Sequence, residues 1–581
     1  MCGIFCYIYH SNQNDDKWSL IKDNISKRGP DSLNIYCHEL NKQLTGKFAA
    51  GVLWMQGPEP QVQPCVDDEG NILLWNGDIF SGPLKSENDS DTLTLLNHLK
   101  LSKNILETIS LIEGPFSLIY YQKSTNLLYF GRDFIGRHSL LIKIVENKFV
   151  MLTSIANNNI DDIIELPACG IFVVDCNNSN FELSCYPWYK LNQYSLKVLN
   201  NLNSSLNIKV KESILSSELI ENVVEPIPED LSHLQDISDI TNIQKTMSEL
   251  LQNPDIYDRV VKLWKLLKKS IEIRIKLKPE YCKNCIKKYL VDKVNKKCSH
   301  AKIGILFSGG LDSTILAAIA NEYVPANESI DLINVAFEKK FNSIGAKNNK
   351  SNNVISIFDV PDRKTGRQAL NELQKLFPLR TWNFIEINVS RKELEDCCKE
   401  IICHLIYPLK TILDESLGCA VWFASRGVGL LSGCKPYESS CRILLLGMGA
   451  DELFGGYTRH RTTLRRHGWK ALSEELNMEL FRISERNLGR DDRVISNHGR
   501  QSRLPYLDEN VIQYVKNLKP WERCYPTEKM PPGLGDKLLL RLLAFKIGLH
   551  ETASFPKRAF QFGSRIANSK QNANDISNWL Q

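Results

Sequence analysis

Ile303-Gly304-Ile305-Leu306-Phe307-Ser308-Gly309-Gly310-Leu311-Asp312-Ser313-Thr314 is the most informative stretch of the chain, and Ile315-Leu316-Ala317-Ala318 follows it. It contains a glycine turn between an apolar run and the apolar start of a helix. Two glycines permit a tight turn with exposed backbone N–H groups, and hydroxyls of Ser308, Ser313 and Thr314 lie beside it at the helix N-terminus. The turn therefore predicts an anion site suited to pyrophosphate. No Gly-Lys-Ser/Thr follows, so it is not a Walker P-loop. A serine-capped glycine turn without a ligand is the alternative.

Apolar runs and helical segments alternate on the C-terminal side of this turn. Because this alternation is typical of parallel strands joined by helices, it predicts a parallel α/β sheet in a domain that spans 303–581. Strands are expected at 303–307, 332–337, 354–358, 382–387 and 443–446. Helices are expected at 313–321 and 367–376, and then in a mostly helical C-terminal part at 472–488, 509–517 and 536–547.

A second glycine turn, Gly447-Met448-Gly449-Ala450-Asp451, follows the apolar run 443–446. The carboxyl ends of parallel strands lie at one edge of a sheet, where ligands bind. Asp312 and Asp451 can therefore face one Mg²⁺ that a triphosphate also coordinates, whereas helix capping by two aspartates is the simpler alternative. The candidate ATP-binding residues are Ser308, Gly309, Gly310, Asp312, Ser313, Gly447 and Gly449.

The first part of the chain instead contains short alternating or aromatic-rich runs separated by turn formers. This pattern predicts packed antiparallel sheets in a domain that spans 1–190, with helices at 17–26 and 90–101. Strands are expected at 5–9, 49–55, 72–75, 116–121, 127–130, 140–145, 149–153 and 170–174. Residues 191–255, rich in Asn, Ser, Glu and Ile, are expected to form a linker with fragmentary structure.

Residues 256–302 are expected to hold an amphipathic helix to about Lys276, followed by a lysine-rich insertion. The insertion contains four metal-ligating side chains, Cys282, Cys285, Cys298 and His300. Their spacing fits a tetrahedral Zn²⁺ site. A solvated insertion with incidental thiols is the alternative.

Cys2 becomes the first residue once Met1 is removed. A free α-amino group with a pKa of roughly 7.7–8.0 is partly neutral at pH 7 and can act as general base for the thiol of the same residue. Asn76 and Gly77 could donate a side-chain amide and a backbone N–H to an oxyanion. A buried structural thiol is the common role of a cysteine and remains the alternative.

The composition limits the class of protein. The chain has 581 residues, of which 43% are hydrophobic and 24% charged, which is typical of globular domains. The formal net charge of +5 is small, so neither nucleic acid nor a membrane surface is expected as the main partner. No apolar run reaches the roughly 18 residues of a membrane helix, and the N-terminus lacks the plan of a signal peptide. With seventeen cysteines scattered through apolar segments, these features predict a cytoplasmic protein with reduced thiols.

The motifs of the second half together resemble a known family. Residues 308–313 are similar to the PP-loop of ATP pyrophosphatases, and 449–457, 503–508 and 537–541 resemble the synthetase domain of glutamine-dependent asparagine synthetases. The resemblance implies that a carboxylate is adenylated by ATP with Mg²⁺, that pyrophosphate leaves and that ammonia displaces AMP. It implies that Asp312 and Asp451 are magnesium ligands and that Lys557 neutralises the activated intermediate.

The first half resembles a class II glutamine amidotransferase. Its motifs occur in the order Cys2-Gly3-Ile4, Arg28-Gly29-Pro30-Asp31, Asn76-Gly77-Asp78 and Ser90-Asp91-Thr92. This resemblance implies an αββα sandwich of the N-terminal-nucleophile type, in which Cys2 hydrolyses glutamine and Arg28 and Asp91 bind it, Asp91 through the α-amino group. For the whole chain it implies ATP-dependent conversion of aspartate to asparagine, with glutamine as nitrogen donor.

Two residues depart from the family pattern. The amidotransferases have an arginine for the α-carboxylate of glutamine where this sequence has Val52, and loss of such a charged hydrogen bond removes roughly 1.5–3 kcal/mol. The synthetases have Gly-Glu-Gly where this sequence has Met448, which cannot accept a proton from ammonia. Both departures favour a catalytically impaired relative that keeps the fold and ATP binding. A PP-loop enzyme that modifies transfer RNA is a second alternative, favoured only by the cysteine cluster.

Overall fold

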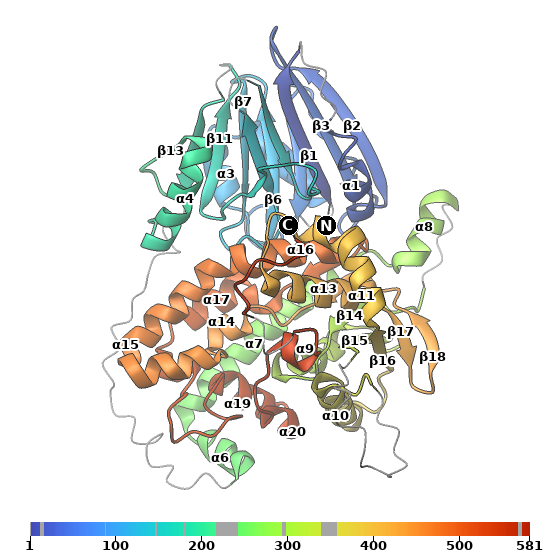
Figure 1. Cartoon of the computed structure of the whole chain (residues 1–581), viewed down its shortest axis with the longest axis vertical. Coiled ribbons are helices and arrows are strands. Elements are labelled where there is room, and N and C mark those ends of the chain that lie inside the picture. Colours follow the sequence, from blue (N-terminus) through green and yellow to red (C-terminus); the bar gives the residue numbers. More distant parts are fainter. Residues whose placement is uncertain are drawn as a thin grey trace.

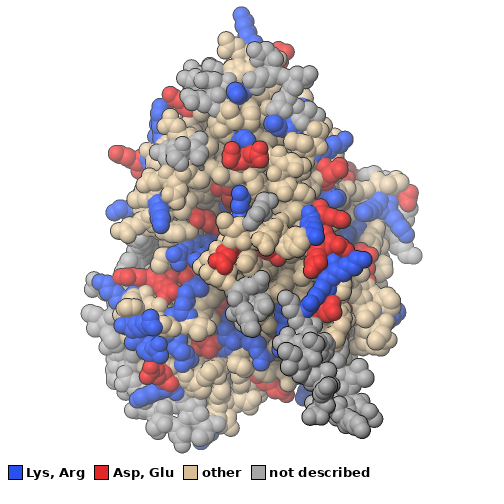
Figure 2. Space-filling model, in the orientation of Figure 1, with Lys and Arg blue, Asp and Glu red and all other residues tan. Residues whose placement is uncertain are grey.

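The computed structural model describes residues 2–11, 17–86, 89–145, 148–177, 181–215, 242–292, 298–338, 357–567 and 572–580, without the side chains of 203–205. Figure 1 shows two domains, a β-rich one at the top and an α/β one below it. In this part of the chain no helix has the length and apolar character needed to cross a membrane. Figure 2 shows acidic and basic side chains interspersed over one face of the molecule, as the small net charge suggests.

The first domain contains two largely antiparallel sheets packed face to face. The first sheet has the order β10 (Ile164–Glu165), β8 (Leu141–Val145), β9 (Phe149–Thr153), β1 (Gly3–His10), β3 (Leu44–Val52) and β2 (Ser32–Glu39). The second has the order β13 (Ile208–Val210), β12 (Leu183–Pro187), β11 (Gly170–Asp175), β7 (Leu127–Arg132), β6 (Phe116–Gln122), β5 (Ile72–Gly77) and β4 (Cys65–Val66).

Helices cover the outer faces of this sandwich, so the layers are helix, sheet, sheet and helix. Helix α1 (Lys22–Arg28) packs on β1 and β3, whereas α2 (Asp91–Leu101) and α3 (Ile105–Ser110) share a core with β5 and β6. Helix α2 starts where expected because Ser90 Oγ accepts a hydrogen bond from Leu93 N–H. Helix α1 is shorter than the predicted 17–26, and β2 was not predicted.

The predicted linker is wrong for its first part. Helix α4 (Gln193–Leu206) packs beside β13, and β13 pairs with β12, so this segment completes the second sheet of the first domain. The helix was not predicted because its largely solvated surface carries many Asn and Ser residues, which are typical of a linker. Pro226 and Pro228 lie outside the described residues.

The second domain contains one twisted sheet with the order β18 (Lys435–Glu438), β17 (Val428–Leu431), β16 (Trp382–Val389), β15 (Ile330–Phe337), β14 (Ile303–Leu306), β19 (Ile443–Leu445) and β20 (Gln501–Arg503). The pairs from β16 to β20 are parallel, as predicted. The antiparallel hairpin of β17 and β18 at one edge was not predicted. Within the strand predicted at 354–358, residues 354–356 lie outside the described part, and Ile357 and Phe358 form a turn.

Helices surround this sheet and form the C-terminal part. They are α6 (Ile243–Leu250), α7 (Pro254–Lys276), α8 (Lys283–Asp292), α9 (Leu311–Tyr323), α10 (Pro361–Leu376), α11 (Arg391–Cys397), α12 (Cys403–Ile406), α13 (Ile412–Arg426), α14 (Ala450–Phe454), α15 (Thr458–Ile483), α16 (Gly489–Ser496), α17 (Glu509–Lys516), α18 (Pro520–Arg523), α19 (Leu538–Lys546), α20 (His550–Ala553) and α21 (Phe560–Gly563). Helices α10 and α13 pack on β15 and β16, which explains why β15 is buried along its whole length.

Buried ion pairs join the two domains. Arg28 pairs with Asp492 at 2.6 Å, and Asp31 pairs with Arg442 at 2.6 Å. The domain contact therefore starts at the helix and turn that follow β1, close to the chain's N-terminus. In Figure 1, α16 lies directly below the first domain.

Two candidate active sites

A pocket of about 1110 Å³ lies at the carboxyl ends of β14 and β19, where the two glycine turns meet. Ser308, Gly310, Asp312, Ser313 and Gly447 line it, together with Gly449, Asp451 and Lys557. Gly309, at φ 75°, packs against the backbone of Gly366 in α10, so a side chain there would collide. The sequence prediction that the two turns lie together is confirmed.

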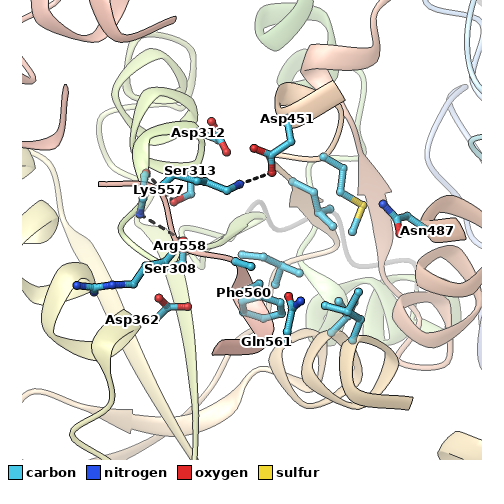
Figure 3. Close-up of a pocket in the computed structure, with 18 of the residues that line it drawn as sticks. Ser308, Asp312, Ser313, Asp362, Asp451, Asn487, Lys557, Arg558, Phe560 and Gln561 are labelled. Atoms are coloured by element: carbon cyan, nitrogen blue, oxygen red, sulfur yellow. Dashed lines mark hydrogen bonds and ion pairs between the residues drawn. The ribbon is translucent and has the colours of Figure 1, made fainter. Parts of the chain in front are cut away.

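The charged groups of this pocket form a connected chain. The Lys537 ammonium lies 2.7 Å from carboxylate oxygens of both Asp312 and Asp451, and Lys557 Nζ donates to the other oxygen of Asp451. Figure 3 shows Lys557 extending to Asp451, with Asp312 beside it. Burial alone would raise the pKa of Asp451, but the two ammonium groups hold it well below its usual range. Asp451 is therefore ionised, and the two carboxyl groups converge on one cation.

Two further acidic side chains lie in this pocket: Asp362, to which no sequence motif assigned a role, and Glu452, which follows Met448 by four residues and is the nearest candidate base. Asp362, in the first turn of α10, has a buried Oδ2 without a hydrogen-bond partner among the described residues. Burial raises its pKa to about 7, although Arg558 and Lys557 oppose this. Glu452 Oε1 accepts a hydrogen bond of 2.5 Å from the Tyr457 hydroxyl. Asp362 was missed because an aspartate in the first turn of a helix ordinarily serves the helix dipole.

Met448 also lines this pocket, and Glu452 on α14 lies four residues after it in the sequence. Burial and the charge of Asp451 raise the pKa of Glu452. A carboxylate with a raised pKa is a better proton acceptor than an ordinary one. Glu452 is thus buried in the same pocket as Met448, as we expect of a base.

A second, much smaller cavity of about 30 Å³ lies beside Cys2 in the first domain. Val52, Gly77, Asp78 and Asp91 line it, and Gln63 Nε2 lies 3.8 Å from Cys2 Sγ. This volume holds about two water molecules and is too small for glutamine. Burial raises the pKa of the Cys2 thiol.

The side chain of Asp91 lines this cavity. Its Oδ2 accepts a hydrogen bond of 3.1 Å from Trp75 Nε1. Burial, with the charge of Asp78, raises the pKa of Asp91 to about 7. An ammonium group placed beside Asp91 would relieve both effects, which is the chemistry predicted for this residue.

Asn76 and Arg28 have other contacts than those predicted. Asn76 Nδ2 donates to Ser117 Oγ at 3.2 Å, and Asn76 does not line the cavity. Arg28 Nε donates to the Cys2 carbonyl at 2.8 Å, while its other nitrogens bond Ser496 and Asp492. Arg28 therefore positions Cys2 and joins the domains in this structure, and its contact with glutamine stays a prediction.

The fold and the two sites define a chain that joins a glutamine amidotransferase domain to an asparagine synthase domain. The model of the asparagine synthase family matches residues 286–473, and that of a glutamine amidotransferase domain matches residues 1–160.

Relatives match the chain over its whole length. An asparagine synthetase domain-containing protein of Drosophila melanogaster is 41% identical and covers 100% of both chains. Asparagine synthetase domain-containing protein 1 of Homo sapiens is 38% identical over 98% of this chain and 95% of its own. A probable glutamine-hydrolysing asparagine synthetase of Acanthamoeba polyphaga mimivirus is 22% identical over 96% and 85%. The chain belongs to the asparagine synthetase domain-containing proteins.

Proposed function

We propose that this protein is an ATP-dependent, glutamine-hydrolysing asparagine synthetase-like ligase, which converts aspartate, glutamine and ATP to asparagine, glutamate, AMP and pyrophosphate. The observation that carries the proposal is the contact of Asp312 and Asp451 with the same ammonium group, beside the turn at Ser308. A triphosphate needs such a site, with N–H donors for its oxygens and ionised carboxylates for its metal.

The donor set fits Mg²⁺. Asp312 and Asp451 offer hard carboxylate oxygens that already converge on one cation, and two lysine ammonium groups keep Asp451 ionised. Magnesium would supply charge neutralisation for the phosphate oxygens when bound. Lys537 holds the two carboxylates together, and the turn at Ser308–Gly310 binds the pyrophosphate that leaves.

Lys557 stabilises the negative charge that develops as the carboxylate attacks the α-phosphorus of ATP. Attack forms the acyl–oxygen–phosphorus bond of the adenylate and breaks the bond to pyrophosphate. Ammonia then attacks the acyl carbon, a base takes one of its protons, and AMP leaves with the bonding electron pair. Glu452 is the base that we assign, because Met448 cannot accept a proton.

In the first domain, the Cys2 sulfur attacks the carboxamide carbon of glutamine and its proton passes to the α-amino group of the same residue. The α-ammonium passes this proton to the departing nitrogen, which leaves as ammonia, and water then hydrolyses the thioester to glutamate. Gly77 would donate its backbone N–H to the oxyanion, and Asp91 would bind the substrate ammonium; Asn76, whose amide donates to Ser117 Oγ, would have to turn toward Cys2 before it could donate as well. The cavity must enlarge before glutamine enters, because about 30 Å³ does not hold it.

Isotope transfer tests the proposal. With aspartate, ATP, Mg²⁺ and glutamine labelled with ¹⁵N in its amide, mass spectrometry should find labelled asparagine, and Cys2→Ala should abolish labelling while unlabelled ammonium still gives product. Mature protein should begin at Cys2, since a retained Met1 would block the amine that acts as base. Cys37→Ala, at an exposed thiol on β2, is the matched control.

A catalytically impaired protein that keeps ATP binding is the second candidate function. Val52, Met448 and the closed cavity favour it, because each removes or obstructs a group needed for nitrogen transfer. This candidate would be established if the protein binds ATP but forms no asparagine with either glutamine or ammonium as nitrogen source. The enzyme that modifies transfer RNA gains no support, since the full-length relatives described above are asparagine synthetase domain-containing proteins.

A further inference from the structure

We propose that Cys282, Cys285, Cys298 and His300 bind one structural Zn²⁺, which fixes helix α8 against Trp54 beside the Cys2 cavity. This metal is independent of the proposed ligase activity, whose chemistry uses neither the four residues nor a soft metal. The inference rests on where the four side chains lie and on what packs around them.

The four ligand atoms come from two segments and converge on one point. Their sulfur and nitrogen atoms all lie within 4.8 Å of one another. The Cys282 and Cys285 sulfurs lie 3.6 and 3.5 Å from His300 Nδ1. A tetrahedral site with Zn–S and Zn–N bonds of about 2.3 and 2.0–2.1 Å requires sulfur–nitrogen separations of about 3.6 Å. These two separations therefore already match the edges of a zinc tetrahedron.

Backbone amides around the cluster suit thiolate ligands. Cys285 N–H points to Cys282 Sγ at 3.5 Å, and Cys282 N–H points to Cys298 Sγ at 3.3 Å. Such donors orient metal-bound sulfurs and compensate their negative charge. Lys302 Nζ donates to the Cys298 carbonyl at 3.1 Å and so fixes the second ligand segment.

The donor types select the metal and its role. Three thiols and one imidazole are soft and borderline ligands, which suit Zn²⁺ and not Mg²⁺ or Ca²⁺. Because all four tetrahedral positions are filled by protein, no position is left for substrate or water, and the site is structural.

The surroundings show what the metal would hold in place. Ile286 in α8 is fully buried, and the Tyr289 ring stacks on Tyr281 at 4.5 Å and on Trp54 at 5.8 Å between centroids. Lys283 N–H also donates to the Ser440 carbonyl at 2.9 Å. Trp54 lines the Cys2 cavity, so the zinc site and the Tyr289 stack together join α8 of the second domain to a wall of that cavity.

Metal analysis tests the site in the full chain. Purified protein should contain about one zinc per chain by inductively coupled plasma mass spectrometry, and Cys285→Ser and His300→Ala should each lose most of it. His300→Cys should keep it, because a fourth thiolate also completes the tetrahedron. Cys434→Ser, at an exposed cysteine elsewhere on the second domain, is the matched control.

Cobalt substitution gives a second readout. Co²⁺ bound to the wild-type chain should show the visible absorption of a tetrahedral thiolate complex, and Cys282→Ser should weaken or shift it. Metal-free wild type, or zinc content unchanged in all single variants, would overturn the site and leave a hydrogen-bonded thiol cluster.

Hydrogen exchange tests the connection to Trp54. Removal of zinc by a chelator should speed amide exchange in α8 and in residues 51–56, and leave α2 unchanged. Faster exchange in α8 alone would overturn the connection. Asparagine formation is measured separately, so failure of the ligase proposal does not alter either outcome.

Discussion

Arg28 Nη2 lies 2.6 Å from Asp492 Oδ2, and both side chains are fully buried between the two domains. Arg28 also donates to the Cys2 carbonyl, so one guanidinium connects the candidate nucleophile to helix α16 of the synthase domain. The same aspartate accepts from His138 Nδ1 at 2.8 Å. The position of Cys2 therefore depends on the domain contact.

Loss of this pair should destabilise the protein strongly. Asp492→Asn leaves the Arg28 charge buried without its counter-ion, which typically costs about 3–5 kcal/mol. We expect a clear fall in the thermal and urea midpoints. Lys209→Ala, which removes an exposed pair with Glu182, should change stability by less than about 1 kcal/mol. Equal effects of the two substitutions would contradict the assigned role.

The Arg28–Asp492 pair also makes the stability of the folded protein depend on pH in acid. Burial opposes ionisation, yet Arg28 and His138 hold the pKa of Asp492 well below its usual range. Because the folded-state pKa is depressed, the stabilisation is fully present above the unfolded value of about 3.9 and is lost progressively as pH falls from that value through the lower folded-state pKa. Asp492→Asn should therefore flatten stability between about pH 5 and 2, as measured by urea unfolding at each pH.

Glutamine binding should weaken in mild acid. The pKa of Asp91 is raised to about 7, and only the carboxylate binds the substrate ammonium. Between pH 8 and pH 6 the affinity of a Cys2→Ala protein should fall by about tenfold in calorimetric titrations. Asp91→Asn should bind weakly at both pH values, and Asp68→Asn, at an exposed turn, should behave as wild type. A pH-independent affinity in the Cys2→Ala protein would argue against Asp91 as the amine ligand.

Proton transfer to Glu452 should limit the synthetase reaction. Glu452→Gln should lower asparagine formation from ammonium by about 10²–10⁴-fold, whereas Met448→Glu should leave it unchanged or raise it. Glu474→Gln, on the exposed face of α15, controls for the amide substitution. Full activity of Glu452→Gln would refute the assigned base. No product from wild type or Met448→Glu would favour the impaired protein.

Magnesium should compete with Lys537 for the two carboxylates. Lys537→Met leaves Asp312 and Asp451 close together with one cation fewer, so Mg²⁺ alone should raise the melting temperature of this variant more than that of wild type. The variant Lys537→Met with Asp312→Asn should lose the added response. Identical responses of wild type and Lys537→Met would argue against a shared metal position.

Sequence reasoning predicted the sites that depend on local motifs. The turns at Gly310 and Gly449 follow parallel strands, and strand order brings both to one pocket. Sequence reasoning missed contacts between residues far apart in the chain. Arg28 lies in a motif that resembles a glutamine-binding motif. Its ion-pair partner Asp492, however, lies in α16, 464 residues further along the chain. The polarity of α4 also hid its place in the first domain. The burial of Asp362 and the small cavity at Cys2 both depend on residues that are distant in the sequence, so no local sequence pattern predicts them.

Exchange of labelled pyrophosphate into ATP tests the central claim most directly. Wild-type protein with Mg²⁺ should catalyse exchange only when aspartate is present, because the adenylate must form and reverse. Lys557→Ala should stop exchange while calorimetry still detects ATP binding, and Asp312→Asn and Asp451→Asn should lose both. Absence of aspartate-dependent exchange in wild type, with equal ATP affinity in wild type and both aspartate variants, would contradict the account.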